Sequence, residues 1–230
     1  MPETAGVAGR TVLIAGATST SGLAATRALL AAGAYVVAAG CDDARLAPLR
    51  ALGAQTHVCD LGDEDAVAAL VDTLHRDDSD GDGTRIDGLL HLVGGWRGGG
   101  GLAGQTDADY RALETGLTAL RHVSRALWGD LVASPAARTA IVSSTAVTRP
   151  LAGGANYAAV KAAEEAWARA MAQGFAKAAR DAGEAPHAAS VVFRVRALAG
   201  LEDALAAAFT GLWDAEASVV NDTVVALGDA

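Results

Sequence analysis

The chain has 230 residues, of which 51% are hydrophobic and 20% are charged, and its formal net charge is −9 at pH 7. This length suits one α/β domain with a full hydrophobic core, so we expect a single domain over residues 1–230. The acidic balance argues against binding to nucleic acid or to an anionic membrane, because both need a basic face. It still allows an anionic ligand, because backbone N–H groups at the start of a helix can hold a phosphate.

The cysteine content and the hydropathy pattern predict the compartment. Two cysteines, Cys41 and Cys59, are too few for a disulfide scaffold and favour a reducing environment. Residues 1–9 lack the basic segment and apolar run that mark a signal peptide. No apolar stretch approaches the roughly 20 residues that a membrane-spanning helix needs. We therefore expect a cytoplasmic protein that does not enter a membrane.

Short apolar segments alternate with helix-like segments along most of the chain, which is typical of a doubly wound parallel sheet with crossover helices. The apolar segments are rich in Val, Ile, Leu and Ala, as in strands that are covered on both faces. They are Thr11–Ala15, Tyr35–Ala39, Gln55–Cys59, Gly88–Val93, Thr139–Ser143, Ala189–Arg194 and Thr223–Leu227. The predicted helices are Gly22–Ala32, Asp43–Leu52, Glu64–His75, Asp107–Trp128, Tyr157–Ala182 and Glu202–Trp213.

Two segments of the chain are expected to be irregular. Residues 76–84 are polar, and their Asp78, Asp80 and Asp82 are spaced like the start of a calcium loop. Position twelve of such a loop would be Leu89 instead of Glu, so we interpret the segment as a solvated loop and predict no metal site. The other segment, Gly94–Gly104, is too rich in glycine for a helix or a strand and directly follows a predicted strand.

The first predicted strand ends in a turn that contains Gly16 and Gly22 and leads into a helix. Free N–H groups point outward at such a helix start, and the helix dipole favours anions there. Gly16 permits a tight turn, and Gly22 lets the helix pack close to the strand. The turn therefore indicates a phosphate site, although connections that bind no ligand use glycine in the same way.

The residues Tyr157 and Lys161 form a Y-x-x-x-K motif on the longest predicted helix. Their i, i+4 spacing places both side chains on one helix face. A nearby ammonium stabilises tyrosinate, so Tyr157 is a candidate proton donor or acceptor. Lys161 is one of only two lysines in the chain, and Ser144 lies thirteen residues before Tyr157 at the end of a predicted strand. Ser143 is the alternative serine.

In this order, the glycine turn, Ser144, Tyr157 and Lys161 resemble the short-chain dehydrogenases/reductases, and the resemblance extends from Val12 to Leu227. It implies a Rossmann-type fold and an NAD(P)-dependent oxidoreductase that transfers a hydride between the nicotinamide and a carbonyl or alcohol of a small molecule. By the same resemblance, Tyr157 transfers the proton, Ser144 polarises the substrate oxygen, and Lys161 supports Tyr157 and holds the nicotinamide ribose. The implied cofactor contacts are Gly16, Ser19, Thr20, Gly22, Cys41, Asp60, Leu61, Val93, Gly94, Tyr157 and Lys161.

The nucleotide side departs from the family pattern. Thr20 replaces the middle glycine of the turn, where a side chain is expected to crowd the cofactor's pyrophosphate or to hydrogen-bond to it. Cys41 stands where NADP-using members carry an arginine, while Asp42 and Arg45 nearby favour opposite nucleotides. Asp60 matches the family's adenine-capping residue but equally fits a turn or a helix cap. The choice between NAD and NADP stays open.

The catalytic side departs from the family as well. Residues 91–94 replace the family's N-N-A-G motif, and Gly116 aligns with an Asn that takes part in a water-mediated proton relay. The usual Pro-Gly after the sixth strand is absent. The segment from Val195 to Asp203 is short where family members place a substrate-covering lid. We therefore expect a pocket that is open or is completed by another chain.

The glycine-rich segment narrows the resemblance. Its sequence G-G-W-R-G-G at residues 94–99 is similar to a stretch in dihydropteridine reductases, a divergent branch of the family that lacks the serine seen here as Ser144. Trp96 is a candidate to stack on a flat heterocycle, and Arg97 is a candidate to meet an acidic substrate. The alternatives are a loop aromatic that covers the edge of the core and a solvated arginine.

Three hypotheses follow for the function. The first is the NAD(P)-dependent oxidoreductase, the second is a dihydropteridine reductase-like enzyme, and the third is a catalytically weak nucleotide-binding scaffold of the same fold. The departures at Thr20, Cys41 and Gly116 favour the scaffold. The intact Ser144, Tyr157 and Lys161 oppose it. Family members commonly pair their long helices, so we expect a homodimer or homotetramer with a small-molecule substrate and no nucleic-acid or membrane partner.

Overall fold

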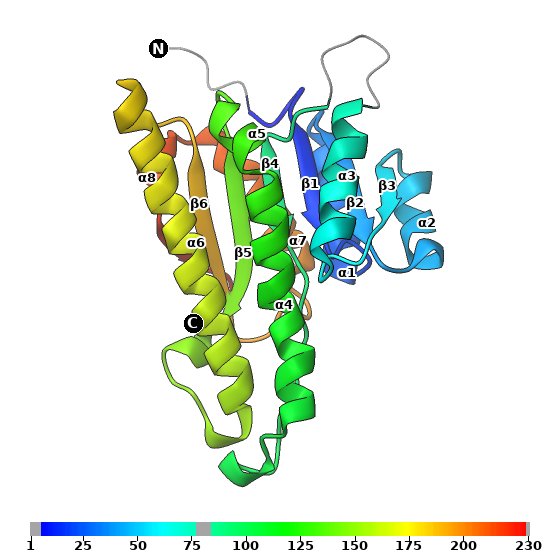
Figure 1. Ribbon diagram of the computed structural model, residues 1–230, viewed down its shortest axis with the longest axis vertical. Helices are drawn as coiled ribbons and strands as arrows, with labels where there is room; N and C mark the ends of the chain where they lie inside the picture. Colours follow the sequence, from blue (N-terminus) through cyan, green and yellow to red (C-terminus); the bar gives the residue numbers. More distant parts are fainter. Residues whose placement is uncertain (1–5, 77–83, 229–230) are drawn as a thin grey trace.

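The computed structural model describes residues 6–76 and 84–228, in which seven strands form one parallel sheet (Figure 1). The strand order is β3-β2-β1-β4-β5-β6-β7, so the sheet grows outward in both directions from the β1–β4 pair. This order confirms the predicted doubly wound fold. The strands are β1 (Thr11–Ala15), β2 (Tyr35–Gly40), β3 (Gln55–Val58), β4 (Gly88–His91), β5 (Arg138–Ser144), β6 (Ala189–Val195) and β7 (Thr223–Ala226).

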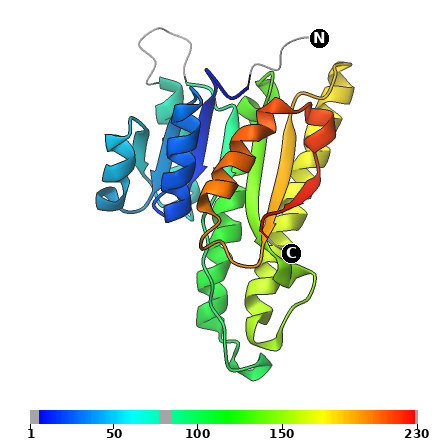
Figure 2. The ribbon, with the colours of Figure 1, turned by 180° about the vertical axis from the view of Figure 1, so that it is seen from behind.

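Helices cover both faces of the sheet. α3, α4 and α6 lie on the face that is turned toward the viewer in Figure 1, and α1 and α7 lie side by side on the opposite face, seen in Figure 2. The helices are α1 (Thr20–Ala31), α2 (Asp43–Ala51), α3 (Glu64–Arg76), α4 (Asp107–Ala126), α5 (Trp128–Ala133), α6 (Ala155–Ala182), α7 (Glu202–Thr210) and α8 (Ala217–Val220). None of these helices is long and apolar enough to cross a membrane.

Hydrophobic side chains pack on both faces of the sheet, because successive side chains along a strand point to opposite faces. In β1, Val12 and Ile14 enter the core beneath α1 and α7, whereas Leu13 and Ala15 enter the core beneath α3 and α4. All four side chains are fully buried. A central strand of a parallel sheet is buried on both faces, which explains its continuous apolar sequence.

The predicted helix Asp107–Trp128 corresponds to α4, which begins at the same residue and is two residues shorter. α4 ends at Ala126, and a separate short helix, α5, begins at Trp128. The Trp128 ring stacks on Phe175 of α6 with centroids 4.8 Å apart, and a Cβ at Gly174 would lie 2.8 Å from that ring. The stacked rings thus join the start of α5 to α6. The prediction for Glu202–Trp213 was also too long, because α7 gives way to a 3₁₀ turn after Thr210.

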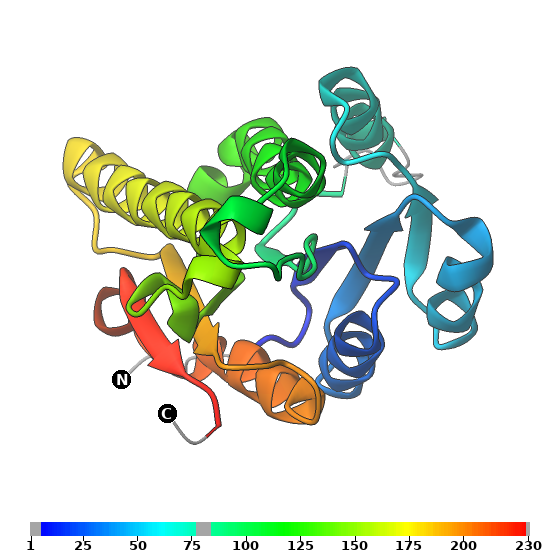
Figure 3. The ribbon, with the colours of Figure 1, turned by 90° about the horizontal axis from the view of Figure 1, so that it is seen from below.

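The carboxyl ends of the strands meet at one edge of the sheet, onto which Figure 3 looks. The sequence runs outward in opposite directions from β1 and β4, and such a switch point is where open α/β sheets bind ligands. The amino-terminal halves of α4 and α6 project beyond this edge in Figure 1. The fold therefore places the ends of β1, β4 and β5 and the beginning of α6 around a common space.

Candidate active site

A cavity of about 1320 Å³ lies at this edge of the sheet. It extends from Ser19 and Ser21 at the start of α1 to Tyr157 and Lys161 on α6. The remaining walls come from residues 91–96 and Gly99 at and after the end of β4, from residues 142–154 around the end of β5, and from residues 195–199 at and after the end of β6. One continuous cavity thus joins the predicted phosphate turn to the predicted catalytic residues.

The glycine turn is as tight as the sequence predicted. Gly16 has a φ of 80°, and a Cβ there would lie 2.8 Å from the backbone nitrogen of Val93. A Cβ at Gly22 would lie 2.1 Å from the carbonyl oxygen of Ala17. No other residue fits at either position, because both contacts are shorter than a van der Waals separation. The Ser19 hydroxyl caps α1 by accepting a hydrogen bond from the Gly22 N–H at 3.1 Å.

The Thr20 side chain is directed away from the cavity. Its hydroxyl donates a hydrogen bond to Glu202 at the start of α7, with 3.4 Å between the oxygens. Thr20 is exposed, whereas its neighbours Ser19 and Ser21 line the cavity. In this rotamer the Thr20 hydroxyl is therefore engaged with α7. Ser21, which the sequence analysis did not single out, takes the place on the cavity wall.

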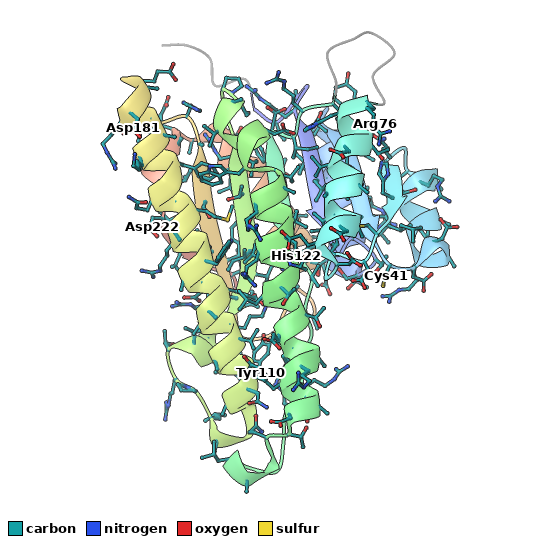
Figure 4. The ribbon with its side chains drawn as sticks, viewed as in Figure 1. Cys41, Arg76, Tyr110, His122, Asp181 and Asp222 are labelled. Carbon is teal, nitrogen blue, oxygen red and sulfur yellow. The ribbon has the colours of Figure 1, made fainter. Side chains whose placement is uncertain are left out.

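The carboxyl ends of β2 and β3 contain the residues expected at the adenosine. Cys41 is exposed at the end of β2 (Figure 4), and Asp42 caps α2 by accepting a hydrogen bond from the Arg45 N–H at 3.2 Å. The Arg45 guanidinium donates to the Thr18 carbonyl at 3.0 Å, so it lies against the glycine turn. Asp60 accepts the N–H of Gly62 at 2.9 Å, which is the turn geometry that the sequence analysis left open.

Several predicted cofactor contacts are not on the cavity wall. Cys41, Asp60 and the buried Leu61 lie at the ends of β2 and β3, beyond the residues that line the cavity. Val93 and Gly94, which follow β4, are part of the wall. The structure thus brings together the turn, the β4 end and α6, while the β2 and β3 ends flank them.

Ser144 and Ser143 point to different sides of β5, as consecutive strand residues must. The Ser144 hydroxyl lines the cavity and accepts a hydrogen bond from the Ala146 N–H at 3.1 Å, which leaves its own proton free to be donated. The Ser143 hydroxyl instead donates to Glu165 of α6 at 2.6 Å. Of the two candidates, Ser144 is the one that faces the space in front of Tyr157.

The Lys161 ammonium is buried and held from two sides. It donates to the Val142 carbonyl at 3.0 Å and to the Glu164 carboxylate at 2.7 Å. An ammonium has three protons, so one remains for the cavity that Lys161 lines. Tyr157, one helical turn earlier, is half-buried on the same wall. The i, i+4 pair is therefore on one face as predicted, and the Lys161 charge is paired within the protein.

His91 is a buried residue of the cavity wall, close enough to Lys161 to be affected by its charge. Burial, together with the Lys161 charge, lowers the pKa of His91 to about 3, against the opposing effect of its hydrogen bond to the Gly116 carbonyl. The ring is therefore neutral at pH 7, and Nε2 donates its hydrogen to that carbonyl at 3.1 Å. The buried Nδ1 has no hydrogen-bond partner.

Two glutamates beside Lys161 were missed by the sequence analysis. Glu164 and Glu165 are 1% and 5% exposed on α6. Glu164 pairs with Lys161, and Glu165 accepts two hydrogen bonds from Arg194 of β6 at 3.0 and 2.6 Å. The available signal was two consecutive acidic residues in an otherwise alanine-rich helix, three and four positions after the only lysine of the catalytic motif.

The glycine-rich loop is hydrogen-bonded to the segment around Gly153, which also lines the cavity. Gly99 donates its N–H to the Gly153 carbonyl at 2.7 Å, and the Gln105 amide bonds the carbonyls of both Gly99 and Gly153. Trp96 lines the cavity and is 62% exposed, so its ring is available to a ligand. The Arg97 guanidinium donates to the Trp96 carbonyl and lies on the exposed side of the loop.

No group of three or more His, Cys, Asp or Glu that could hold a metal ion occurs in residues 6–76 and 84–228. The aspartates at 78, 80 and 82 that resemble the start of a calcium loop lie outside these ranges. Both cysteines are free thiols.

Comparisons with known proteins agree with this fold. The sequence matches the family described as short chain dehydrogenase over residues 10–179. A short chain dehydrogenase/reductase family protein has a TM-score of 0.79 and 23% identity, with 96% of each chain covered. An NAD+-bound xylitol dehydrogenase has a TM-score of 0.80 and 18% identity, with 97% of this chain and 99% of that chain covered.

An NADPH-bound short chain oxidoreductase from Pseudomonas aeruginosa, described as containing an atypical catalytic center, has a TM-score of 0.78 and 19% identity over 94% of each chain. The comparison with curated proteins gives no significant match. The low identities agree with the departures seen at Thr20, Cys41 and Gly116. The family match covers well over half of the sequence, and the chain therefore belongs to the short-chain dehydrogenases, a family of NAD(P)-dependent oxidoreductases.

Proposed function

We propose that the protein transfers a hydride between a nicotinamide cofactor and a carbonyl or alcohol of a small molecule, with Tyr157 as the proton donor or acceptor. The observation that carries this proposal is the shared cavity, because Ser144, Tyr157 and Lys161 line the same space as the start of α1. The α1 N-terminus, with its glycine turn, supplies the phosphate-binding end of that space.

The residues fit such a cofactor. The backbone N–H groups at the start of α1, with Ser19 and Ser21, would hold the pyrophosphate, and Val93, Gly94 and Lys161 would hold the nicotinamide end. The cavity of about 1320 Å³ joins these two ends without interruption. The cofactor supplies the hydride when it is bound.

The protein's own part is the proton and its position. Ser144 donates its free hydrogen to the substrate oxygen and so orients the reacting carbon. Tyr157 gives its hydroxyl proton to that oxygen, or takes one from it in the reverse direction. Lys161, fixed by Val142 and Glu164, directs its remaining N–H into the cavity and favours the tyrosinate form.

Replacement of Tyr157 by Phe tests the proton-transfer role. We expect Tyr157→Phe to lower turnover by at least about 100-fold, because general acid–base catalysis contributes that much or more. Affinity for the nicotinamide cofactor, measured by fluorescence titration, should stay within about threefold of wild type. Tyr35→Phe is the matched control, because Tyr35 is exposed at the start of β2, at the opposite edge of the sheet. Unchanged turnover in Tyr157→Phe would remove Tyr157 as the proton donor.

We also infer that NADP is preferred to NAD. The Asp42 carboxylate is engaged in capping α2, whereas the Arg45 guanidinium lies between the end of β2 and the glycine turn, where it can pair with the extra phosphate of NADP. Parallel titrations with NADPH and NADH should show about tenfold tighter binding of NADPH, and Arg45→Ala should remove the difference. Arg50→Ala, on the same helix but paired with Asp43, is the control. Equal affinities in wild type would contradict the inference.

A dihydropteridine reductase-like activity is the second candidate, and the exposed Trp96 ring on the cavity wall favours it because a flat heterocycle could stack there. A screen with a panel of carbonyl compounds and with quinonoid dihydropterin separates the two activities. Cofactor binding without turnover of any of these compounds would instead favour the nucleotide-binding scaffold.

We further propose that the protein is a cytoplasmic homo-oligomer, paired through the outer faces of α4 and α6. The free thiols of Cys41 and Cys59 are consistent with a reducing compartment. α4 and α6 lie next to each other on one face of the sheet (Figure 1), so one surface presents both helices to a second copy. Elution at the monomer mass of 23.0 kDa under native conditions would contradict the pairing.

A further inference from the structure

Glu164 is a buried acid in direct contact with the catalytic lysine. Its side chain is 1% exposed, and its Oε2 accepts a hydrogen bond from the Lys161 ammonium at 2.7 Å. Charged side chains are rarely buried to this extent without a specific partner. Lys161 is that partner, and the two residues lie one helical turn apart on α6.

The neighbouring helix leaves room for this acid. α4 and α6 pack side by side in Figures 1 and 3, and Gly116 is the α4 residue that faces Glu164. A Cβ on Gly116 would lie 2.9 Å from Oε1 of Glu164 and 3.1 Å from the carbonyl oxygen of Val93. Both separations are too short for a carbon atom. The absence of a side chain at residue 116 is therefore what allows a glutamate to reach this position.

The groups around the Lys161–Glu164 pair come from α6, β4 and α4. α6 contributes Lys161 itself and Tyr157 on the same face. β4 contributes His91, which is neutral, and α4 contributes the uncharged Gly116. The next residue, Glu165, faces β5 and β6 and is paired with Arg194. Glu164 is therefore the one described anion in contact with the Lys161 ammonium.

This contact has two consequences for Lys161. The bonds to Glu164 and to the Val142 carbonyl fix two of its three protons, which directs the third into the cavity. The negative charge of Glu164 also opposes the positive charge of Lys161, and both groups are buried, so water screens this opposition only weakly. Burial raises the pKa of Glu164, and the charge and hydrogen bond of Lys161 oppose that rise in part.

We propose that Glu164 is a positioning residue that orients the Lys161 ammonium toward the cavity and, through its charge, opposes the effect of that ammonium on the hydroxyl proton of Tyr157. The proposal rests on the proposed role of Tyr157. It differs from the Asn-based water relay that the family resemblance implies for position 116, because here a carboxylate touches the lysine directly.

The test is a titration of the protein without cofactor. The chain contains only three tyrosines, so the ultraviolet absorbance of tyrosinate, read as the difference from Tyr157→Phe, isolates the ionisation of Tyr157. Glu164→Gln keeps the shape and an oxygen acceptor for Lys161 but removes the charge. We expect the Tyr157 midpoint to fall by about half a pH unit to one unit. An unchanged or higher midpoint would overturn the proposal.

A conservative variant and a surface control separate the charge from the fold. Glu164→Asp keeps the carboxylate, so its midpoint should return toward wild type even if its thermal stability is lower. Glu184→Gln removes one carboxylate just after the end of α6, where the side chain is 63% exposed, and should leave the midpoint unchanged. A midpoint in Glu164→Asp that matches Glu164→Gln would refute the role assigned to the charge.

The pH profile of turnover gives an independent readout. In the oxidation direction, the acid limb of kcat for Glu164→Gln should shift to lower pH by the same amount as the tyrosine midpoint. If Tyr157→Phe retains full turnover, the proposed function fails, while the titration without cofactor still reads the effect of Glu164 on Tyr157. If Tyr157→Phe is inactive but Glu164→Gln titrates like wild type, only the inference about Glu164 fails.

Discussion

Glu164 and Glu165 are consecutive residues on α6 and are almost equally buried, yet the protein treats their carboxyl groups in opposite ways. Burial raises the pKa of Glu164, and its single partner, Lys161, does not offset that effect. Burial also acts to raise the pKa of Glu165, but hydrogen bonds from Arg194 and Ser143, with the charges of Arg194 and Arg169, bring it below its ordinary value. The two carboxyl groups face different neighbours because α6 turns by about 100° per residue.

The opposite pKa directions follow the number and charge of the donors around each carboxyl group. Glu165 receives a two-point bond from a guanidinium and a third bond from a hydroxyl, which together replace the water it has lost. Among the described residues, Glu164 accepts a hydrogen bond only from the Lys161 ammonium, which also donates to the Val142 carbonyl and lines the cavity. Glu165 therefore serves as a structural clamp between α6, β5 and β6, while Glu164 remains sensitive to what happens in the site.

The largest expected effect on stability comes from breaking the clamp. Glu165→Ala leaves the Arg194 guanidinium and the Ser143 hydroxyl without their acceptor, so we expect the free energy of unfolding to fall by about 3 kcal/mol. This is at the lower end for a buried pair, because the Arg194 side chain is 19% exposed and can reach water. Urea denaturation of Glu165→Ala against the surface variant Glu184→Ala measures the difference. A loss no larger than that of the surface variant would show that the clamp has no structural role.

A smaller loss is expected when the space beside Glu164 is filled. Gly116→Ala would normally stabilise a helix by about 1 kcal/mol, but here the new Cβ meets Glu164 and the Val93 carbonyl. We expect a net loss of about 1 to 2 kcal/mol, because overpacking of this kind forces the neighbours to move. Gly129→Ala in α5 is the control, since a Cβ there meets nothing within 4 Å and should be neutral or stabilising. Similar gains in both variants would mean that Glu164 moves aside freely.

The strands and the shared face of the catalytic pair could be predicted from the sequence, whereas the partners of the two glutamates could not. Strand positions follow from local apolar composition, and the shared face of Tyr157 and Lys161 follows from helical spacing. The partner of an acid on a buried helix depends on which residues the fold brings opposite it. Arg194 is 29 residues from Glu165, and Gly116 is 48 residues from Glu164, so neither neighbour could be inferred from local pattern.

The same limit applies elsewhere in the site. The two serines at the end of β5 could be identified as candidates, but the choice between them depends on which face of the strand the cavity occupies. Thr20 could be recognised as a departure from the family's glycine, but its hydrogen bond to Glu202 depends on how α7 packs beside α1. In each case the residue type was visible in the sequence and its direction was set by tertiary packing.

The smallest expected difference between the two glutamates is in how each makes the free energy of unfolding depend on pH. The pKa of Glu165 is lower in the folded protein than in the unfolded chain, so its contribution is complete above the unfolded pKa and is lost as the pH falls through the folded pKa. The pKa of Glu164 is raised, so its contribution is complete below the unfolded pKa and is lost as the pH rises through the folded pKa. Lys161 stays paired in both ranges through Val142.

Glu165→Gln and Glu164→Gln should therefore differ from wild type with slopes of opposite sign. From neutral pH toward about pH 4, the advantage of wild type over Glu165→Gln should shrink, whereas the stability of wild type relative to Glu164→Gln should rise. Thermal unfolding of the three proteins across this pH series measures both slopes under the same conditions. Two slopes of the same sign would mean that the carboxyl groups titrate alike, and the contrast between one donor and three would then lose its physical basis.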